Sequence, residues 1–261
     1  MAKIADILSI IESFAPVRLQ ESYDNAGLQV GDREADVSAV LMCLDVTEEI
    51  VAEAVERGCG LIISHHPLLF GGIRQVTADS GRGRIVIEAI KAGISIYSAH
   101  TNLDRAREGV SWEIARMLGL RQLEVLEKDN ADPEVGLGIV GNTDQMPALE
   151  FLRKVKDTFH VRCLRYSDNF PRLTVKRVAV CGGAGASLIR EAAAAGADVI
   201  VTGDVKYHDF TTWASRILIA DIGHYESEIC TKQIFMRLLA DRFPDLQLYT
   251  AESDTNPVNC L

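Results

Sequence analysis

Short apolar runs alternate with segments of helical periodicity along most of this chain. Residues 37–44, 61–63 and 94–98 are continuous apolar runs, and residues 47–57 and 84–92 have helical patterns between them. Continuous apolar strands that are separated by helices are typical of a parallel or mixed sheet covered on both faces. The pattern therefore predicts an α/β fold.

The beginning of the chain predicts an amphipathic helix. Apolar residues recur at helical spacing in residues 1–14, and Asp6 and Glu12 interrupt the segment. The segment therefore differs from a signal peptide, and no apolar run elsewhere is long enough to span a membrane.

The six cysteines include no CxxC pair. We therefore expect reduced, mostly structural cysteines and a cytoplasmic location.

The strand–helix–strand pattern returns in the second half of the chain. The interval from Cys43 to His65 has the same length as the interval from Cys181 to Gly203, and the two intervals align without gaps. This self-similarity predicts a duplicated unit. Two unrelated βαβ units of similar appearance are the alternative.

The duplication predicts two similar α/β halves. We expect the first half to cover residues 1–123, with residues 245–261 as a segment that can return to it, and the second to cover residues 124–244. Within the second half, residues 136–141 predict a Gly-rich edge strand. Pro147 begins a predicted helix, preceded by Asp144 as a candidate cap.

Four of the six histidines come directly after predicted strands, where open α/β sheets bind their ligands. They are His65, His66, His100 and His224. His100 and Asp104 are four residues apart, as are His224 and Glu228, and this spacing places each pair on one face of a helical turn. A single histidine after a strand is more often a hydrogen-bonded loop residue. The adjacent pair and the repeated histidine–carboxylate spacing favour metal ligands instead.

The ligand types indicate which ions would bind. Imidazole with carboxylate suits zinc, iron, manganese or nickel rather than calcium. Four imidazoles and two carboxylates suit two ions that share a bridging carboxylate. Asp204 and His208 follow the strand that matches the His65–His66 strand. Both are candidates to line the same site, and His160 is expected to be structural or on the surface.

A Gly-rich turn at residues 182–185 lies between a predicted strand and a predicted helix. It lacks the Lys-Ser/Thr of a P-loop, so a tight turn is favoured over a loop that cradles phosphate. The net charge of −10 argues against a broad phosphate-binding face.

Six segments together resemble one known family. They are residues 22–31, 63–68, 99–104, 203–208, 223–228 and 255–257. In this order they resemble the NIF-three-like dinuclear metal centre family, whose members are often named GTP cyclohydrolase 1 type 2 homologues. The chain is similar to the short form, which has no inserted central domain.

The resemblance implies a metal site and an assembly. The implied ligands are His65, His66, His100, Asp104, His224 and Glu228. The resemblance also implies two similar α/β halves that face each other across two divalent transition-metal ions (zinc, iron or manganese). A toroidal homohexamer with its sites facing an internal cavity is implied as well.

The implied activity is attack of metal-activated water on the purine ring of GTP, and His208 or Asp204 would move a proton. Nothing in the sequence specifies guanine. The residues themselves therefore favour a metal-dependent hydrolase that acts on a small molecule, and a nucleotide is one candidate. Two alternatives stay open: a non-catalytic metal-handling protein or chaperone, and a toroidal ring that binds DNA or a partner. The net charge of −10 weighs against the DNA ring.

Overall fold

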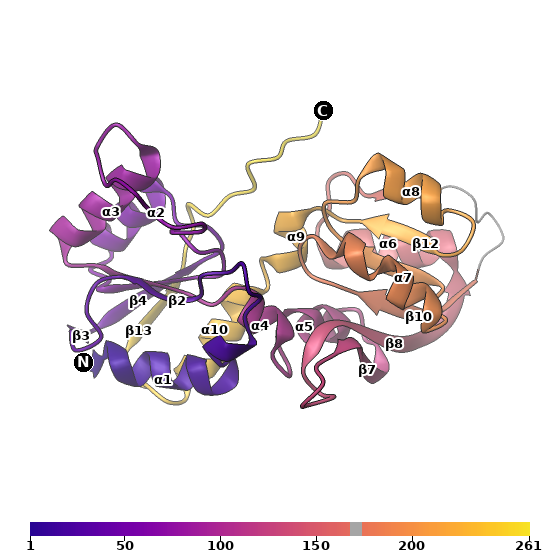
Figure 1. The fold of residues 1–261 in the computed structure, drawn as a ribbon, viewed down its shortest axis with the longest axis horizontal. Coiled ribbons are helices and arrows are strands. Elements are labelled where there is room, and N and C mark those ends of the chain that lie inside the picture. Colours follow the sequence, from indigo (N-terminus) through magenta and orange to yellow (C-terminus); the bar gives the residue numbers. More distant parts are fainter. Residues whose placement is uncertain (168–173) are drawn as a thin grey trace. The chain divides into compact units, whose positions relative to one another are not determined.

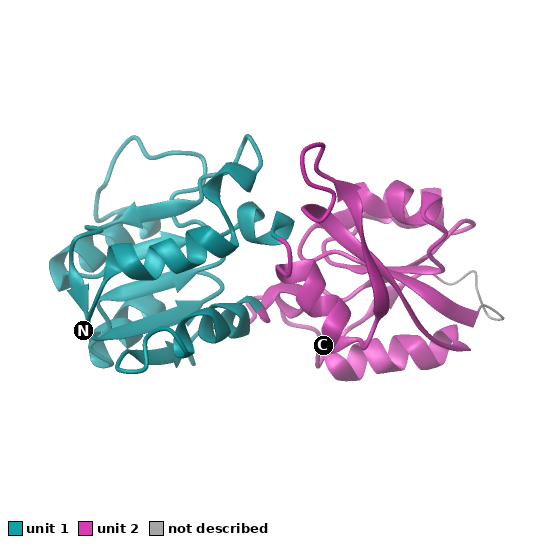
Figure 2. Cartoon of the chain, turned by 90° about the horizontal axis from the view of Figure 1, so that it is seen from below, with its two compact units in different colours: residues 1–106, 231–255 teal, residues 107–230, 256–261 magenta. Residues whose placement is uncertain are grey.

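The computed structural model describes residues 1–167 and 174–261, which form two compact units (Figure 2). Unit 1 comprises residues 1–106 and 231–255, and unit 2 comprises residues 107–230 and 256–261. Each unit has a mixed sheet covered by helices (Figure 1). The predicted α/β class is therefore confirmed.

The sheet of unit 1 has the strand order β13-β4-β5-β6-β2. Its strands are β2 (Gly27–Val30), β4 (Ala39–Cys43), β5 (Leu61–Ser64), β6 (Ser95–Ser98) and β13 (Gln247–Thr250). Four of them are parallel, and β2 pairs antiparallel with β6 at the edge. All residues of β4, β5 and β6 are buried, which is why these strands have no polar alternation. A separate two-stranded sheet joins β1 (Ala2–Lys3) to β3 (Asp36–Val37).

The helices of unit 1 cover both faces of this sheet. They are α1 (Ile4–Phe14), η1 (Val17–Leu19), α2 (Glu48–Glu56), α3 (Gly81–Ala92), α4 (Thr101–Arg105) and α10 (Thr231–Ala240). Helices α2 and α3 lie on one face, and α1 and α10 lie on the other (Figure 1). The hydroxyl of Thr47 accepts from the amide of Ile50 and caps the beginning of α2. Gly93 ends α3 in the left-handed conformation, which glycine adopts readily.

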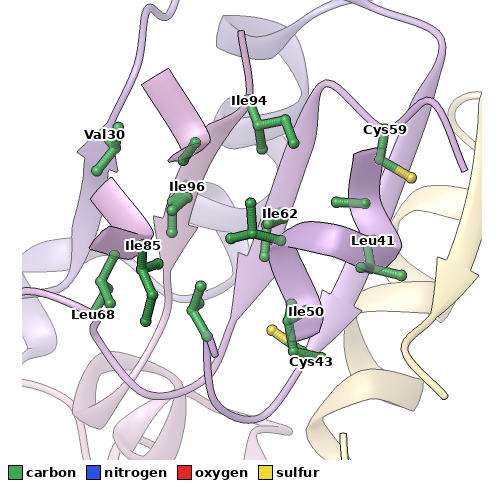
Figure 3. Packing of buried hydrophobic residues seen from close by; sticks show 14 of the residues in the cluster. Val30, Leu41, Cys43, Ile50, Cys59, Ile62, Leu68, Ile85, Ile94 and Ile96 are labelled. Carbon is green, nitrogen blue, oxygen red and sulfur yellow. The ribbon is translucent and has the colours of Figure 1, made fainter. Parts of the chain in front are cut away.

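Aliphatic side chains from helices and strands form the core between the sheet and helices α2 and α3. Leu41, Ile62 and Ile96 come from the three central strands, and Ile50 and Ile85 come from the helices (Figure 3). Complete burial of one such side chain contributes about 1.5–3 kcal/mol to folding. This packing holds β4, β5 and β6 in place, and it therefore fixes the positions of the residues that follow each strand.

The sheet of unit 2 has the strand order β7-β8-β10-β11-β12-β9. Its strands are β7 (Arg121–Lys128), β8 (Gly136–Pro147), β9 (Arg165–Tyr166), β10 (Thr174–Val180), β11 (Val199–Thr202) and β12 (Leu218–Asp221). Strands β10, β11 and β12 are parallel, and β9 pairs antiparallel with β12. Unit 1 has the same local order in β4, β5, β6 and β2. This likeness supports the predicted duplication, which stays a prediction.

Two sequence-based expectations for unit 2 were wrong. The Gly-rich strand β8 lies inside the sheet between β7 and β10 and is not an edge strand. The strand β7, which forms the edge beside β8, was not predicted because only Val125 among its eight residues is buried. Asp144 does not cap the next helix, since it lies within β8 and forms an ion pair with Arg121.

The helices of unit 2 are short. They are α5 (Val110–Met117), α6 (Ala148–Thr158), η2 (Gly185–Leu188), α7 (Ile189–Ala194), α8 (Tyr207–Trp213) and α9 (His224–Glu228). Helices α5 and α6 pack on β8 and β10, whereas α7 packs on β11 and α8 on β12. In the part of the chain that the structure describes, no helix has the length and apolar character needed to cross a membrane.

Candidate metal centre

Three histidines of unit 1 lie together at one edge of its sheet. His65 and His66 directly follow β5, and His100 comes shortly after the parallel neighbour β6. The ring centroids lie 5.1 Å apart for His65 and His66, 5.3 Å for His65 and His100, and 5.6 Å for His66 and His100. One nitrogen of each ring lies within 4.8 Å of the other two. The three side chains, hereafter the histidine cluster, are thus close enough to bind one ion.

Hydrogen bonds orient the first two rings of the histidine cluster. Nδ1 of the buried His65 lies 2.8 Å from the carbonyl oxygen of Ala99, which can only accept a hydrogen bond. Nδ1 of His66 lies 2.8 Å from Oδ1 of Asp45. In each ring Nδ1 therefore carries the proton, and Nε2 keeps its lone pair. This tautomer is the one that allows each histidine to bind a metal through Nε2.

The third ring is oriented by a buried carboxylate. Nδ1 of His100 lies 2.7 Å from Oδ1 of Asp24, whose other oxygen accepts the amide and hydroxyl protons of Thr101. Burial raises the pKa of Asp24, but the hydrogen bonds from His100 and Thr101 outweigh it and lower the pKa to about 2. Asp24 is therefore ionised at neutral pH and holds the proton of His100 on Nδ1.

Asp104 adds a carboxylate oxygen to the histidine cluster. The predicted helical turn after His100 is confirmed as α4, in which the amide of Asp104 donates to the carbonyl of His100. Oδ1 of Asp104 lies 3.6 Å from Nε2 of His65. Two ligands of a tetrahedral ion, each about 2.0–2.1 Å from it, are about 3.4 Å apart. Imidazole and carboxylate suit a divalent transition metal, and the spacing of Nε2 of His65 and Oδ1 of Asp104 fits two ligands of one such ion.

Unit 2 contains the second histidine–carboxylate pair. His224 and Glu228 begin and end α9, so the predicted helical turn is confirmed here too. Nε2 of His224 lies 2.9 Å from Oε2 of Glu228, and its Nδ1 lies 2.9 Å from Oδ2 of Asp204. Asp204 therefore orients His224 as Asp24 orients His100. The pair offers an imidazole nitrogen and carboxylate oxygens to an ion.

The Gly-rich turn of unit 2 lies directly against Glu228. A Cβ atom at Gly183 would lie 2.2 Å from Oε1 of Glu228, so only glycine leaves room for this carboxylate. The amide of Gly183 donates to the hydroxyl of Ser227, and that of Gly185 donates to the hydroxyl of Thr202. Since side-chain hydroxyls already accept from these amides, the turn supports the Glu228 site rather than a bound phosphate.

The remaining sequence candidates lie on the surface of unit 2. Asp204 is exposed and adopts a left-handed conformation with φ of 54°. His208 is exposed in the first turn of α8, where its ring centroid lies 5.5 Å from that of Tyr207. His160 is exposed after α6, as expected.

The carboxylates that orient the rings of unit 1 were not among the residues predicted from the sequence. Asp24 lies in one of the segments that carry the family resemblance, but no role was assigned to it. Asp45 comes shortly after β4, at the same edge of the sheet as the strand ends that precede the histidine cluster. Its place after a buried strand was the signal that could have found it.

A family profile matches nearly the whole chain. The profile of Duf34/NIF3 (NGG1p interacting factor 3) matches residues 2–257. The chain belongs to the Duf34/NIF3 family. A relative from Clostridium perfringens, named GTP cyclohydrolase 1 type 2 homolog, is 41% identical over 228 residues, which are 87% of each chain. A relative of the same name from Streptococcus pneumoniae is 34% identical and covers 97% of both chains.

Solved structures show the same fold for this Duf34/NIF3 member. The Bacillus cereus protein related to NIF3 has a TM-score of 0.93 at 26% identity and covers 100% of this chain and 99% of its own. A hypothetical protein of Staphylococcus aureus also has a TM-score of 0.93, at 29% identity and with 99% of each chain covered. The fold is therefore shared along the full length of these relatives.

Proposed function

We propose that this Duf34/NIF3 protein binds two divalent transition-metal ions and acts as a metal-dependent hydrolase on a small molecule. Zinc, iron or manganese would be held by His65, His66, His100, Asp104, His224 and Glu228. One observation carries the proposal. All three Nδ1 atoms of the histidine cluster are held by acceptors, which leaves three Nε2 atoms for an ion.

The two ligand sets support binding of more than one ion. Within unit 1, the histidine cluster offers three imidazole nitrogens to an ion, and Asp104 adds a carboxylate oxygen near His65. His224 and Glu228 supply further ligands from unit 2, again with an oriented imidazole. We propose, as the family resemblance implies, that both sets serve one dinuclear centre with a bridging carboxylate.

When bound, two such ions lower the pKa of a coordinated water and polarise the group under attack. Oδ2 of Asp204 accepts a hydrogen bond from Nδ1 of His224 and therefore orients a ligand. Because this carboxylate is already engaged, it is less suited to transfer a proton to or from the substrate. His208 donates no ring hydrogen bond in the described structure and is exposed, so its imidazole can take up or return a proton of the substrate. Of the two predicted catalytic residues, we therefore favour His208 for proton transfer.

The substrate class rests on the relatives. The relatives from Clostridium perfringens and Streptococcus pneumoniae are named GTP cyclohydrolase 1 type 2 homolog, which supports a nucleotide. The ring centroid of Phe70 lies 6.0 Å from that of His100, and the two rings are perpendicular. The ring centroid of Tyr23 lies 6.4 Å from that of Phe70. Both side chains are exposed, Tyr23 to 65% and Phe70 to 43%, and they offer an apolar surface that suits a planar base.

Turnover by metal-loaded protein tests the proposal. The protein is reconstituted with zinc, manganese or iron and incubated with GTP, other nucleotides and simple phosphate esters, and products are followed by mass spectrometry. We expect hydrolysis of at least one compound, and loss of that activity in His208→Ala at unchanged metal content. The matched control is His160→Ala, which removes an exposed histidine elsewhere in unit 2. Tight metal binding without turnover of any compound would favour a metal-handling protein instead.

A further inference from the structure

One buried carboxylate of unit 2 connects the segments that carry Asp204 and His224. Asp221 is the last residue of β12, and only 2% of its surface is exposed. Its Oδ2 accepts the amide proton of Val205 at 3.0 Å, and its Oδ1 accepts that of Gly223, also at 3.0 Å. A single side chain therefore joins the residue after Asp204 to the residue before His224.

Arg165 completes the attachment of Val205. It lies opposite Asp221 in the antiparallel pair of β9 and β12, and its guanidinium forms an ion pair with the Asp221 carboxylate. Nη2 of Arg165 also donates to the carbonyl oxygen of Val205 at 3.0 Å. Both backbone groups of Val205 are therefore bound. The ion pair also compensates the charge of Asp221, because an ionised carboxylate is costly to bury without a partner.

The residue before Asp204 is held as well. The amide of Gly203 donates to the carbonyl oxygen of Gly183 at 2.8 Å. A Cβ atom at Gly203 would lie 2.9 Å from the amide nitrogen of His224, so only glycine allows the two segments to approach this closely. Asp204 thus lies between two residues whose backbones are fixed.

Asp204 itself has a strained backbone. Its φ of 54° lies in the left-handed region, which residues other than glycine adopt infrequently. Such a conformation persists where the surrounding structure holds it. From this conformation, Oδ2 of Asp204 lies 2.9 Å from Nδ1 of His224. The hydrogen bonds of Asp221 and Arg165 to Val205 therefore act next to the residue that needs to be held.

We propose that Asp221 is a positioning residue of the metal centre, which holds Asp204 in the conformation that brings its carboxylate to His224. This role rests on the proposed metal binding by His224. Asp221 acts through two backbone amides and not as a ligand, and Arg165 supports it from the neighbouring strand. A correctly oriented His224 binds its ion more tightly, as expected when the partner of a metal-binding imidazole is in place.

Crystal structures of metal-free parent and Asp221→Asn test the positioning. Asparagine has one oxygen, so its NH2 group must face a backbone amide that the carboxylate accepted. We expect the hydrogen bond between Asp204 and His224 to be present in the parent and lost in the variant, with the two atoms more than about 3.5 Å apart. An unchanged hydrogen bond in the variant would overturn the proposal. Since no metal is needed, this result stands even if the parent binds no ion and the proposed function fails.

Zinc affinity tests whether Asp221 acts through Asp204. In competition with a chromophoric chelator, Asp221→Asn should weaken zinc binding at least about threefold, and Asp204→Asn about tenfold. In the double variant, Asp221→Asn should add little, because the residue that it positions is already changed. Losses that multiply in the double variant would show that Asp221 acts independently of Asp204, and they would overturn the proposal.

Asp198→Asn is the matched control. Asp198 also accepts two backbone amides of unit 2, those of Lys176 and Arg177, but it precedes β11 whereas Asp204 follows this strand. Asp198→Asn should keep the zinc affinity of the parent.

Arg165→Ala is the second variant if Asp221→Asn does not fold, since the Arg165 side chain is 56% exposed. It should also lose the hydrogen bond between Asp204 and His224 and weaken zinc binding. A parent-like hydrogen bond in Arg165→Ala would then overturn the proposal.

Discussion

Oδ1 of Asp24 lies 2.7 Å from Nδ1 of His100, and this carboxylate has no exposed surface. Asp24 precedes β2, whereas His100 follows β6, so the pairing of these two strands brings the residues together. A carboxylate at this position fixes the tautomer and the direction of the imidazole. The readiness of Nε2 to bind an ion therefore depends on a residue that is not itself a ligand.

Asp24→Asn should weaken metal binding while the fold survives. The amide of asparagine lacks the negative charge that favours a proton on Nδ1 of His100. Loss of such an orienting partner typically lowers metal affinity 10–100-fold. Competition with a chromophoric chelator measures the change. The control is Asp36→Asn, which alters an exposed aspartate of the same unit. Equal affinity in Asp24→Asn and the parent would show that the carboxylate does not orient a ligand.

Gly183→Ala should displace Glu228. Its added Cβ would lie 2.2 Å from Oε1 of Glu228, whereas a Cβ at Gly196 would meet no atom within 4 Å. Both glycines have a left-handed backbone, so each alanine should destabilise the fold by about 1 kcal/mol through backbone strain. Only Gly183→Ala should also lose metal affinity. Thermal unfolding and metal titration of the two variants separate these effects, and equal metal binding in both would remove Glu228 as a ligand.

Glu53 should make the free energy of unfolding of unit 1 depend on pH. Burial raises the pKa of Glu53, but hydrogen bonds from Ser253 and Glu252 and the charge of Arg57 outweigh it and lower the pKa. A lowered folded-state pKa means that the stabilisation is complete above the ordinary glutamate pKa and is lost as the pH falls through the folded value. Glu53→Gln should therefore cost about 1–2 kcal/mol at pH 7 and less at pH 3.

Urea unfolding at the two pH values checks this prediction. The matched control is Glu56→Gln, since Glu56 is exposed on the same helix. Its stability should match that of the parent at both pH values. A cost of Glu53→Gln that stays the same at pH 3 would show that the ionised carboxylate is not what holds residues 252 and 253.

The family resemblance predicts a closed hexamer. Closed symmetric assemblies are the usual form of soluble oligomers. Light scattering on purified protein should give a mass near six times the chain mass of 28.6 kDa. A stable monomer at micromolar concentration would rule out the toroid and its enclosed cavity, and it would leave the metal ligands of each chain unaffected.

The sequence predicted the parts of the fold that depend on local patterns. The buried strands β5 and β11 and the helices α1, α2 and α3 followed from apolar runs and helical spacing. Strand β7 did not, because its polar side chains give no apolar signal and only its pairing with β8 defines it. Sequence patterns record burial and turn chemistry, and pairing between distant segments leaves little local trace.

The same difference applies to the site. Histidine and carboxylate at i and i+4 predicted the turns α4 and α9 because both members of each pair lie in one segment. Asp24 and His100 are 76 residues apart, so only the folded sheet shows that they meet. Local spacing can therefore identify ligands, but the residues that orient those ligands require the structure.

Metal content tests the central claim most directly. Protein purified without chelator is analysed by inductively coupled plasma mass spectrometry, before and after reconstitution with zinc, manganese and iron. The oriented Nε2 atoms of His65, His66 and His100 predict between about one and two equivalents of a transition metal per chain. Less than about 0.2 equivalents after reconstitution with every one of these metals would contradict the account.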